Sequence, residues 1–248
     1  MDAQTNEGQD DAGRFEKYNR IGKVFEHWAA HAMQHFDMDV DLVGNDLAKQ
    51  TRIGDTEQGH EMKHDTLMHG SGNLSIELYS RGRKSSINKP DIKTLVQGNV
   101  MAREFFVYPK EPLLGQCLEW YDNEDNPDNR RWVAGTTGNA SGVLIRGQEK
   151  EDFADYRFQM VQHKGYWFLR RTEYEDTLSD TVKAVKHARY KDYKCTRAED
   201  LIKLFAAGKN RVVRSDYPHY DQFIREGFSD FNQGHDPDAV AFMADSLR

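Results

Sequence analysis

The chain has 248 residues, a formal net charge of −7 and only two cysteines, Cys117 and Cys195. The negative charge argues against generic nucleic-acid binding, which requires a basic face, and two cysteines are too few for a disulfide framework. The apolar stretches are all well short of the roughly 18 residues that a membrane-spanning helix requires. We therefore expect one cytoplasmic, monomeric domain that binds neither nucleic acid nor membranes.

The N-terminal part of the chain predicts a leader followed by a helix. Residues 1–13 are polar and acidic, and we interpret them as a disordered leader that precedes a single domain spanning 14–248. From residue 15 to residue 36, apolar side chains recur three and four positions apart, which predicts an amphipathic helix. Residues 37–72 show no such period and predict irregular chain with one short strand.

This irregular segment contains an HExxH string, His60-Glu61-Met62-Lys63-His64. On a helix, the two histidines would share a face and could bind zinc, with the glutamate as general base. However, the flanking residues are polar and would not bury such a helix beside a cleft, and the third histidine of the metzincin pattern is absent. A zinc hydrolase is therefore the weaker alternative, and we expect no metal site.

From Leu74 onward the apolar residues alternate with polar ones, which predicts strands. The predicted strands cover residues 74–79, 100–108, 113–121, 131–135, 142–146, 156–162 and 166–171. Their short connections favour an antiparallel meander over βαβ units. Helices are predicted at 180–193, 196–207, 217–231 and 236–247. The expected fold is a single α/β domain with a central antiparallel sheet flanked by helices, an α/β/α sandwich.

The strand predicted at 113–121 suggests one functional carboxylate. Because side chains alternate along a strand, Cys117, Glu119 and Tyr121 would share a face. Glu119 would then be either a proton donor with a raised pKa among aromatic groups or a solvent-facing residue of an edge strand.

A local basic run near the predicted helix at 180–193 contrasts with the acidic chain. It contains one acid, Asp192, and six cations: Lys183, Lys186, Arg189, Lys191, Lys194 and Arg197. This run is either a solvated helix face or a docking surface for an acidic partner or an anionic ligand.

The string Val107-Tyr108-Pro109-Lys110, followed by Pro112-Leu113-Leu114-Gly115, resembles the ferredoxin-dependent bilin reductases. The predicted N-terminal helix, the strand Trp167-Phe168-Leu169-Arg170 and the stretches 215–220 and 241–247 are similar to further parts of that family, in the same order. The resemblance implies reduction of a linear tetrapyrrole such as biliverdin by reduced ferredoxin, without a metal or flavin bound to the chain. A non-catalytic bilin-binding protein of the same fold is the alternative.

The resemblance also implies site residues, with two departures. The family's proton-donating aspartate falls on Cys117, and another strand position of its site falls on Glu104. Glu119, about 7 Å further along the predicted strand face, would take over proton delivery, and Glu226 corresponds to a carboxylate near the bilin in some members. Substrate binding is expected at Tyr108 and at four arginines that could hold the propionates: Arg81, Arg83, Arg170 and Arg171. Ferredoxin would bind at Lys183, Lys186, Arg189, Lys191 and Lys194.

Overall fold

The computed structural model describes residues 7–44, 46–123, 130–133, 139–163, 166–177 and 185–195. The helices predicted at 196–207, 217–231 and 236–247 lie outside these residues, as do Lys183, Arg197 and Glu226. None of the described helices is long and apolar enough to cross a membrane.

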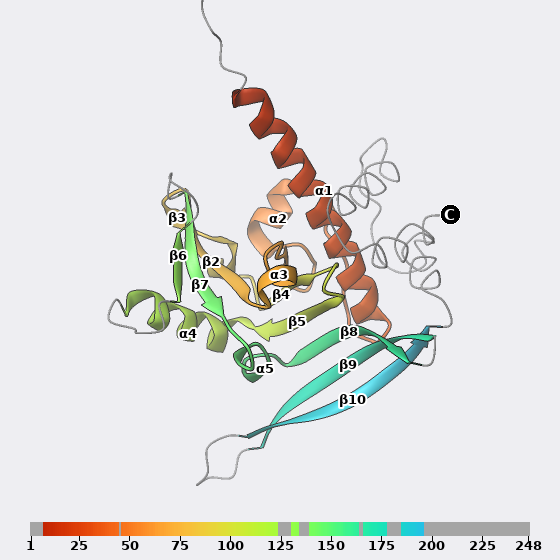
Figure 1. Cartoon of the computed structure of the whole chain (residues 1–248). Helices are drawn as coiled ribbons and strands as arrows, with labels where there is room; N and C mark the ends of the chain where they lie inside the picture. Colours follow the sequence, from red (N-terminus) through yellow and green to blue (C-terminus); the bar gives the residue numbers. More distant parts are fainter. Residues whose placement is uncertain are drawn as a thin grey trace, which may run out of the picture.

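The described chain forms five α-helices, one 3₁₀ helix and ten strands (Figure 1). The helices are α1 (Glu7–Gln34), α2 (Leu47–Ile53), α3 (Met68–Ser71), η1 (Ser86–Asn88), α4 (Lys110–Asp122) and α5 (Glu149–Asp152). The strands are β1 (His60–His64), β2 (Leu74–Ser80), β3 (Arg83–Lys84), β4 (Thr94–Asn99), β5 (Glu104–Pro109), β6 (Arg131–Val133), β7 (Ala140–Ile145), β8 (Tyr156–His163), β9 (Tyr166–Thr177) and β10 (Val185–Cys195). The predicted α/β class is confirmed.

The strands build two sheets rather than one. The larger has the order β1-β4-β5-β8-β9-β10, and the smaller has the order β3-β2-β7-β6. The expectation of a purely antiparallel sheet is not met in the larger one, because β1 runs parallel to β4. The chain crosses from the larger sheet to the smaller and back twice, since β2 and β3 lie between β1 and β4, while β6 and β7 lie between β5 and β8.

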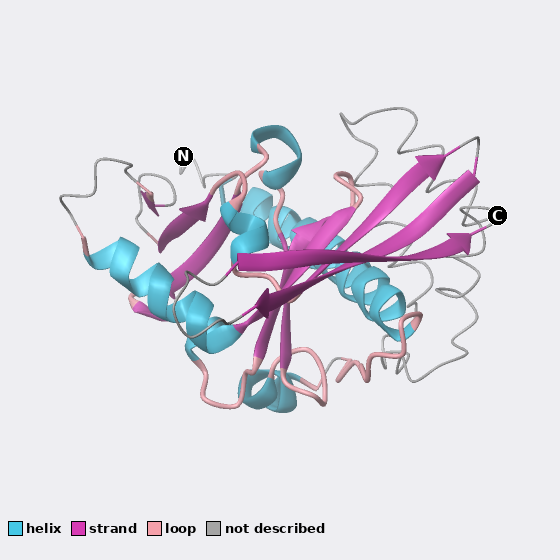
Figure 2. Ribbon diagram, turned by 90° about the horizontal axis from the view of Figure 1, so that it is seen from below, coloured by secondary structure: helices cyan, strands magenta, loops and turns pink. Residues whose placement is uncertain are grey.

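One face of the larger sheet packs on α1, as predicted from the apolar stripe. Phe25 and Met33 of α1 are fully buried against Phe105 of β5 and Phe158 of β8. In Figure 2 the long strands of the larger sheet run across this helix. The helix begins at Glu7, so its first residues fall within the segment expected to be a disordered leader, and its N-terminal turns project beyond the sheets (Figure 1).

The other face of the larger sheet packs on the smaller sheet and α4. Phe106 and Tyr108 of β5 lie in one apolar cluster with Leu74, Ile76 and Leu78 of β2. The alternation predicted for β2 is confirmed, because these three side chains are buried and those between them are only half-buried. Among the described residues, the second layer is therefore made by the smaller sheet together with α4 rather than by helices alone.

The strand predicted at 113–121 is wrong, because these residues belong to α4. Inward-facing side chains recur every four residues in this segment rather than every two. Leu113 and Cys117 are buried on one face of the helix, and Tyr121 follows on the same face. Pro112 lies in the first helical turn, where a missing backbone N–H removes no intrahelical hydrogen bond. The consequence is that Cys117 and Glu119 do not share a face.

The helix predicted at 180–193 is also wrong where the structure describes it, because residues 185–195 form β10. This strand pairs antiparallel with β9 along its whole length, from Val185 opposite Thr177 to Cys195 opposite Trp167. Long-range pairing with β9 therefore outweighs the weak local helical pattern.

Candidate functional site

A cleft in the described part of the chain lies where α4 begins, beside α5 and strands β9 and β10. We call it the α4–α5 cleft, and its volume is about 640 Å³. Small-molecule sites typically have volumes of about 300–1,000 Å³. Its walls combine prolines and aromatics with charged side chains: Pro109, Pro112, Gln148, Glu151, Asp152, Phe153, Asp155, Tyr174, Lys186 and Ala188.

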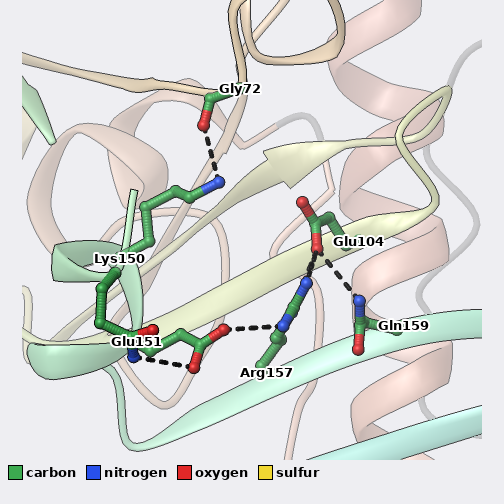
Figure 3. Close-up of polar contacts among 7 residues, drawn as sticks. Gly72, Glu104, Lys150, Glu151, Arg157 and Gln159 are labelled. Carbon is green, nitrogen blue, oxygen red and sulfur yellow. Dashed lines mark hydrogen bonds and ion pairs between the residues drawn. The ribbon is translucent and has the colours of Figure 1, made fainter. Parts of the chain in front are cut away.

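Arg157 of β8 joins one wall of this cleft to the interior (Figure 3). Its Nη1 lies 2.8 Å from Oε1 of the cleft residue Glu151, and its Nε and Nη2 lie 3.1 and 2.7 Å from Oε2 of Glu104. Gln159 donates a further hydrogen bond of 3.2 Å to the same Glu104 oxygen. Only 14% of the Glu104 side chain is exposed. This network fixes Glu151 at the cleft, because Arg157 is itself held from the other side.

Tyr174 of β9 lines the cleft beside Glu151, and its surroundings change its acidity. Burial raises the pKa of its phenol, and the negative charge of Glu151 and a hydrogen bond between the two side chains raise it further. The phenol therefore stays protonated at neutral pH and is a weaker acid than an ordinary tyrosine, so it can serve a ligand as a hydrogen-bonding group.

The cleft is acidic overall. Three carboxylates line it, on Glu151, Asp152 and Asp155, against the single ammonium group of Lys186. The Lys186 Nζ donates a hydrogen bond of 3.0 Å to the Ala154 carbonyl. Such a wall favours N–H donors or cations in a ligand and disfavours its carboxylates.

The structure separates the two residues on which the predicted proton transfer depended. Cys117 is fully buried, and burial raises the pKa of its thiol to about 12. Glu119 lies on the exposed side of α4, where it accepts a hydrogen bond of 3.0 Å from Gln116. Neither residue lines the cleft. The predicted shared face of Cys117 and Glu119 is wrong, because the two side chains lie on opposite sides of α4.

We predict that Cys117 resists alkylation in the folded protein. With a pKa of about 12, only about one thiol in ten thousand is ionised at about pH 8, and the sulfur is shielded from solvent. Iodoacetamide treatment followed by mass spectrometry should leave Cys117 unmodified until urea unfolds the chain. Modification at the same rate with and without urea would contradict its buried position.

The four arginines that were expected to hold the propionates do not converge on one site. Arg81 lies in the turn of the β2–β3 hairpin and Arg83 in β3, and both are exposed. Arg170 and Arg171 are neighbours on β9 and therefore lie on opposite sheet faces. Arg170 lies over the Tyr190 ring, whereas Arg171 is buried and donates to the Phe36 carbonyl.

Tyr108 and Glu104 lie near the cleft without lining it. Tyr108 is fully buried next to Pro109, and its hydroxyl has no hydrogen-bond partner among the described residues. Burial, and then the negative charge of Glu104, raise the pKa of this phenol well above its usual value. The Tyr-Pro string therefore contributes Pro109, rather than Tyr108, to the cleft wall.

The basic run lies on β10, where opposite acids of β9 partly neutralise it. Arg189 pairs with Glu175 at 3.0 Å, and Lys191 pairs with Glu173 at 3.1 Å. Lys194 also belongs to this strand.

The HExxH string does not form a zinc-binding helix, because it is strand β1. His64 packs against the Phe25 ring of α1, whereas Glu61 lies on the opposite face and pairs with Lys63 at 2.6 Å. Across the part of the chain that the structure describes, no three His, Cys, Asp or Glu side chains are grouped so that they could hold a metal ion.

The sequence reasoning missed Glu151, Arg157 and Tyr174. One signal was available in β8, where Arg157 and Gln159 alternate with apolar residues that face α1. These two polar side chains therefore had to point into the second layer of the protein and required a buried acid as partner.

The chain matches no known family model, and no curated protein or solved structure is similar enough to it to be matched. The functional argument therefore depends on the residues of the site.

Proposed function

We propose that this protein binds an open-chain tetrapyrrole, such as biliverdin, in the α4–α5 cleft. The observation that carries the proposal is the position of Pro109 and Pro112. Both belong to the segment that resembles the bilin reductases, and both line a cleft of about 640 Å³. Phe153 and Tyr174 supply aromatic surface for the flat, apolar body of such a ligand.

The charges of the cleft suggest an orientation for the ligand. Pyrrole N–H groups are hydrogen-bond donors, and the carboxylates of Glu151, Asp152 and Asp155 can accept from them. The two propionates would be repelled by these acids and would point to solvent. In this orientation the propionates are not held by the four arginines that the resemblance implies.

Reduction of the bound pigment is a second candidate function, favoured by the contact between Tyr174 and Glu151. Reduction of one double bond takes two electrons, which two reduced ferredoxins would deliver one at a time, and two protons. Both protons would come from solvent and reach the ligand through the Tyr174 hydroxyl, which would be reprotonated by water after each transfer, while Glu151 would hold the phenol in place. Lys186, Arg189 and Lys191 of β10 would dock the acidic ferredoxin, although two of these cations are partly neutralised by β9.

Binding without catalysis has the stronger support. The position expected to carry the proton-donating aspartate is the buried Cys117, and the substitute expected for it, Glu119, lies outside the cleft. A reductase of this fold would need Tyr174 or Glu151 in a role that the resemblance does not give them.

Titration with biliverdin, followed by its absorption in the red, tests the binding proposal. We expect a saturable spectral change and, in Tyr174→Ala, a dissociation constant at least about tenfold higher, a loss of about 1.4 kcal/mol. Glu119→Gln is the matched control and should stay within about twofold of the natural protein. Absence of a spectral change with excess pigment, or equal affinity in Tyr174→Ala, would refute the proposal.

The same complex, mixed anaerobically with a ferredoxin-reducing system, separates the two functions. A reductase should bleach or shift the pigment band over minutes, and Glu151→Gln should slow that change while the pigment still binds. A stable band identifies a binding protein.

A further inference from the structure

A second, smaller cleft lies between the two sheets. We call it the inter-sheet cleft, and its volume is about 260 Å³. The larger sheet contributes Lys63 and Gln97 to its wall, and the smaller sheet contributes Glu77 and Trp132. Nothing in the resemblance to bilin reductases concerns these residues.

Two of the carboxylates in or beside this cleft already have partners. Asp65 accepts hydrogen bonds from the backbone and hydroxyl groups of Ser75, at 2.6 and 2.8 Å, and from Gln97 at 3.2 Å. Glu61 is buried and pairs with Lys63, and a hydrogen bond from Ser86 also holds it. These two acids therefore serve to hold the elements of the cleft together.

Glu77 is different, because its carboxylate receives no hydrogen bond from the described residues. The side chain lines the cleft and is half-buried. Burial raises its pKa, the negative charge of Glu61 raises it further, and Lys63 opposes both. A partly desolvated carboxylate without a donor gains from a ligand that supplies one.

The remaining walls of the cleft suit the apolar part of such a ligand. Trp132 is half-buried, and its indole N–H donates a hydrogen bond of 3.2 Å to the Val143 carbonyl, which holds the ring in place. Leu67 is 67% exposed beside it. An indole face attracts cations as well as apolar groups.

We propose that the inter-sheet cleft binds a small organic cation, an alkylammonium or alkylguanidinium group, with its charge on Glu77 and its short apolar stem against Trp132. The charge balance supports a cation over an anion, since Asp65 and Glu77 line the cleft with Lys63 and His64, and Lys63 is already paired with the neighbouring Glu61. The volume limits the ligand to a small one. This site is separate from the α4–α5 cleft and does not depend on the bilin proposal.

Calorimetric titration with agmatine and with butylamine, compared with the neutral butanol, tests the site. We expect the amines to bind with a dissociation constant below about 1 mM and butanol to bind at least about tenfold more weakly. Because the cation competes with the proton on Glu77, amine affinity should rise as the pH is raised from about 4 to about 7.

Variants of the two walls complete the test. Glu77→Gln should weaken amine binding at least about tenfold, Glu77→Asp should retain part of it, and Trp132→Ala should weaken it while Trp132→Phe retains it. Glu111→Gln, an exposed acid on α4, is the control and should bind as the natural protein does. Undetectable amine binding, equal binding of butanol, or Glu77→Asp and Glu77→Gln both binding at full strength would overturn the proposal.

Discussion

Replacement of Phe105 by alanine is expected to lower the free energy of unfolding by about 4 kcal/mol, the largest effect that we predict for one substitution. Phe105 is fully buried in β5 and stacks on Phe158, with ring centroids 4.6 Å apart. It also meets the edges of Trp28 at 5.0 Å and Phe25 at 6.2 Å. The substitution would remove the contact between α1 and the centre of the larger sheet and would leave a cavity.

Urea denaturation measures this effect. Phe105→Leu keeps most of the volume and should cost only about 1.5 kcal/mol. Leu47→Ala is the control, because Leu47 is 74% exposed and its loss should change stability by less than about 0.5 kcal/mol. Equal costs for Phe105→Ala and Leu47→Ala would contradict the packing described for β5.

Replacement of Arg157 by methionine is expected to cost about 3 kcal/mol, because it leaves two acids without their partner. Glu104 would lose both of its hydrogen bonds from the guanidinium, and Glu151 would lose one. Methionine keeps much of the side-chain volume over the Phe106 ring, which Arg157 now covers at 5.5 Å. The loss therefore measures mainly the uncompensated charge.

A double-mutant cycle with Glu104→Gln checks this interpretation. When Glu104 is neutral, the Arg157→Met substitution should cost about 2 kcal/mol less than in the natural chain, because only the more exposed carboxylate of Glu151 then loses the guanidinium. Urea midpoints of the four proteins give the coupling. Strict additivity would mean that the ion pair adds nothing to the stability.

The parts of the fold that could be predicted are those where one face is buried and the other is solvated. The helix α1 and the strand β2 each bury one stripe, so their periods of 3.6 and 2 are visible in the sequence. The strand β4 was missed because it is buried on both faces and shows no alternation. The helix α4 was misread because only three of its residues are buried, and only two of these, Leu113 and Cys117, are apolar, which is too few to define a period.

The candidate site was predictable only in its local part. Pro109 and Glu104 were identified from the sequence because both lie in the single strand β5, which carries part of the resemblance to the bilin reductases. Tyr174 and Glu151 come from β9 and from the four-residue helix α5, and they meet only after three strands have paired. Contacts of this kind leave no mark in a sequence window, so these two cleft residues could not be predicted from the sequence.

The double crossing of the chain between its sheets means that neither sheet exists as a continuous piece of the sequence. A fragment that ends after β5 lacks two strands of the smaller sheet, and one that begins at β4 lacks the other two. The smaller sheet can therefore be completed only after β7 has been synthesised, and the larger sheet only after β10, which favours slow folding. Fusion partners or inserted tags should be joined outside the region from β1 to β10 rather than placed within it.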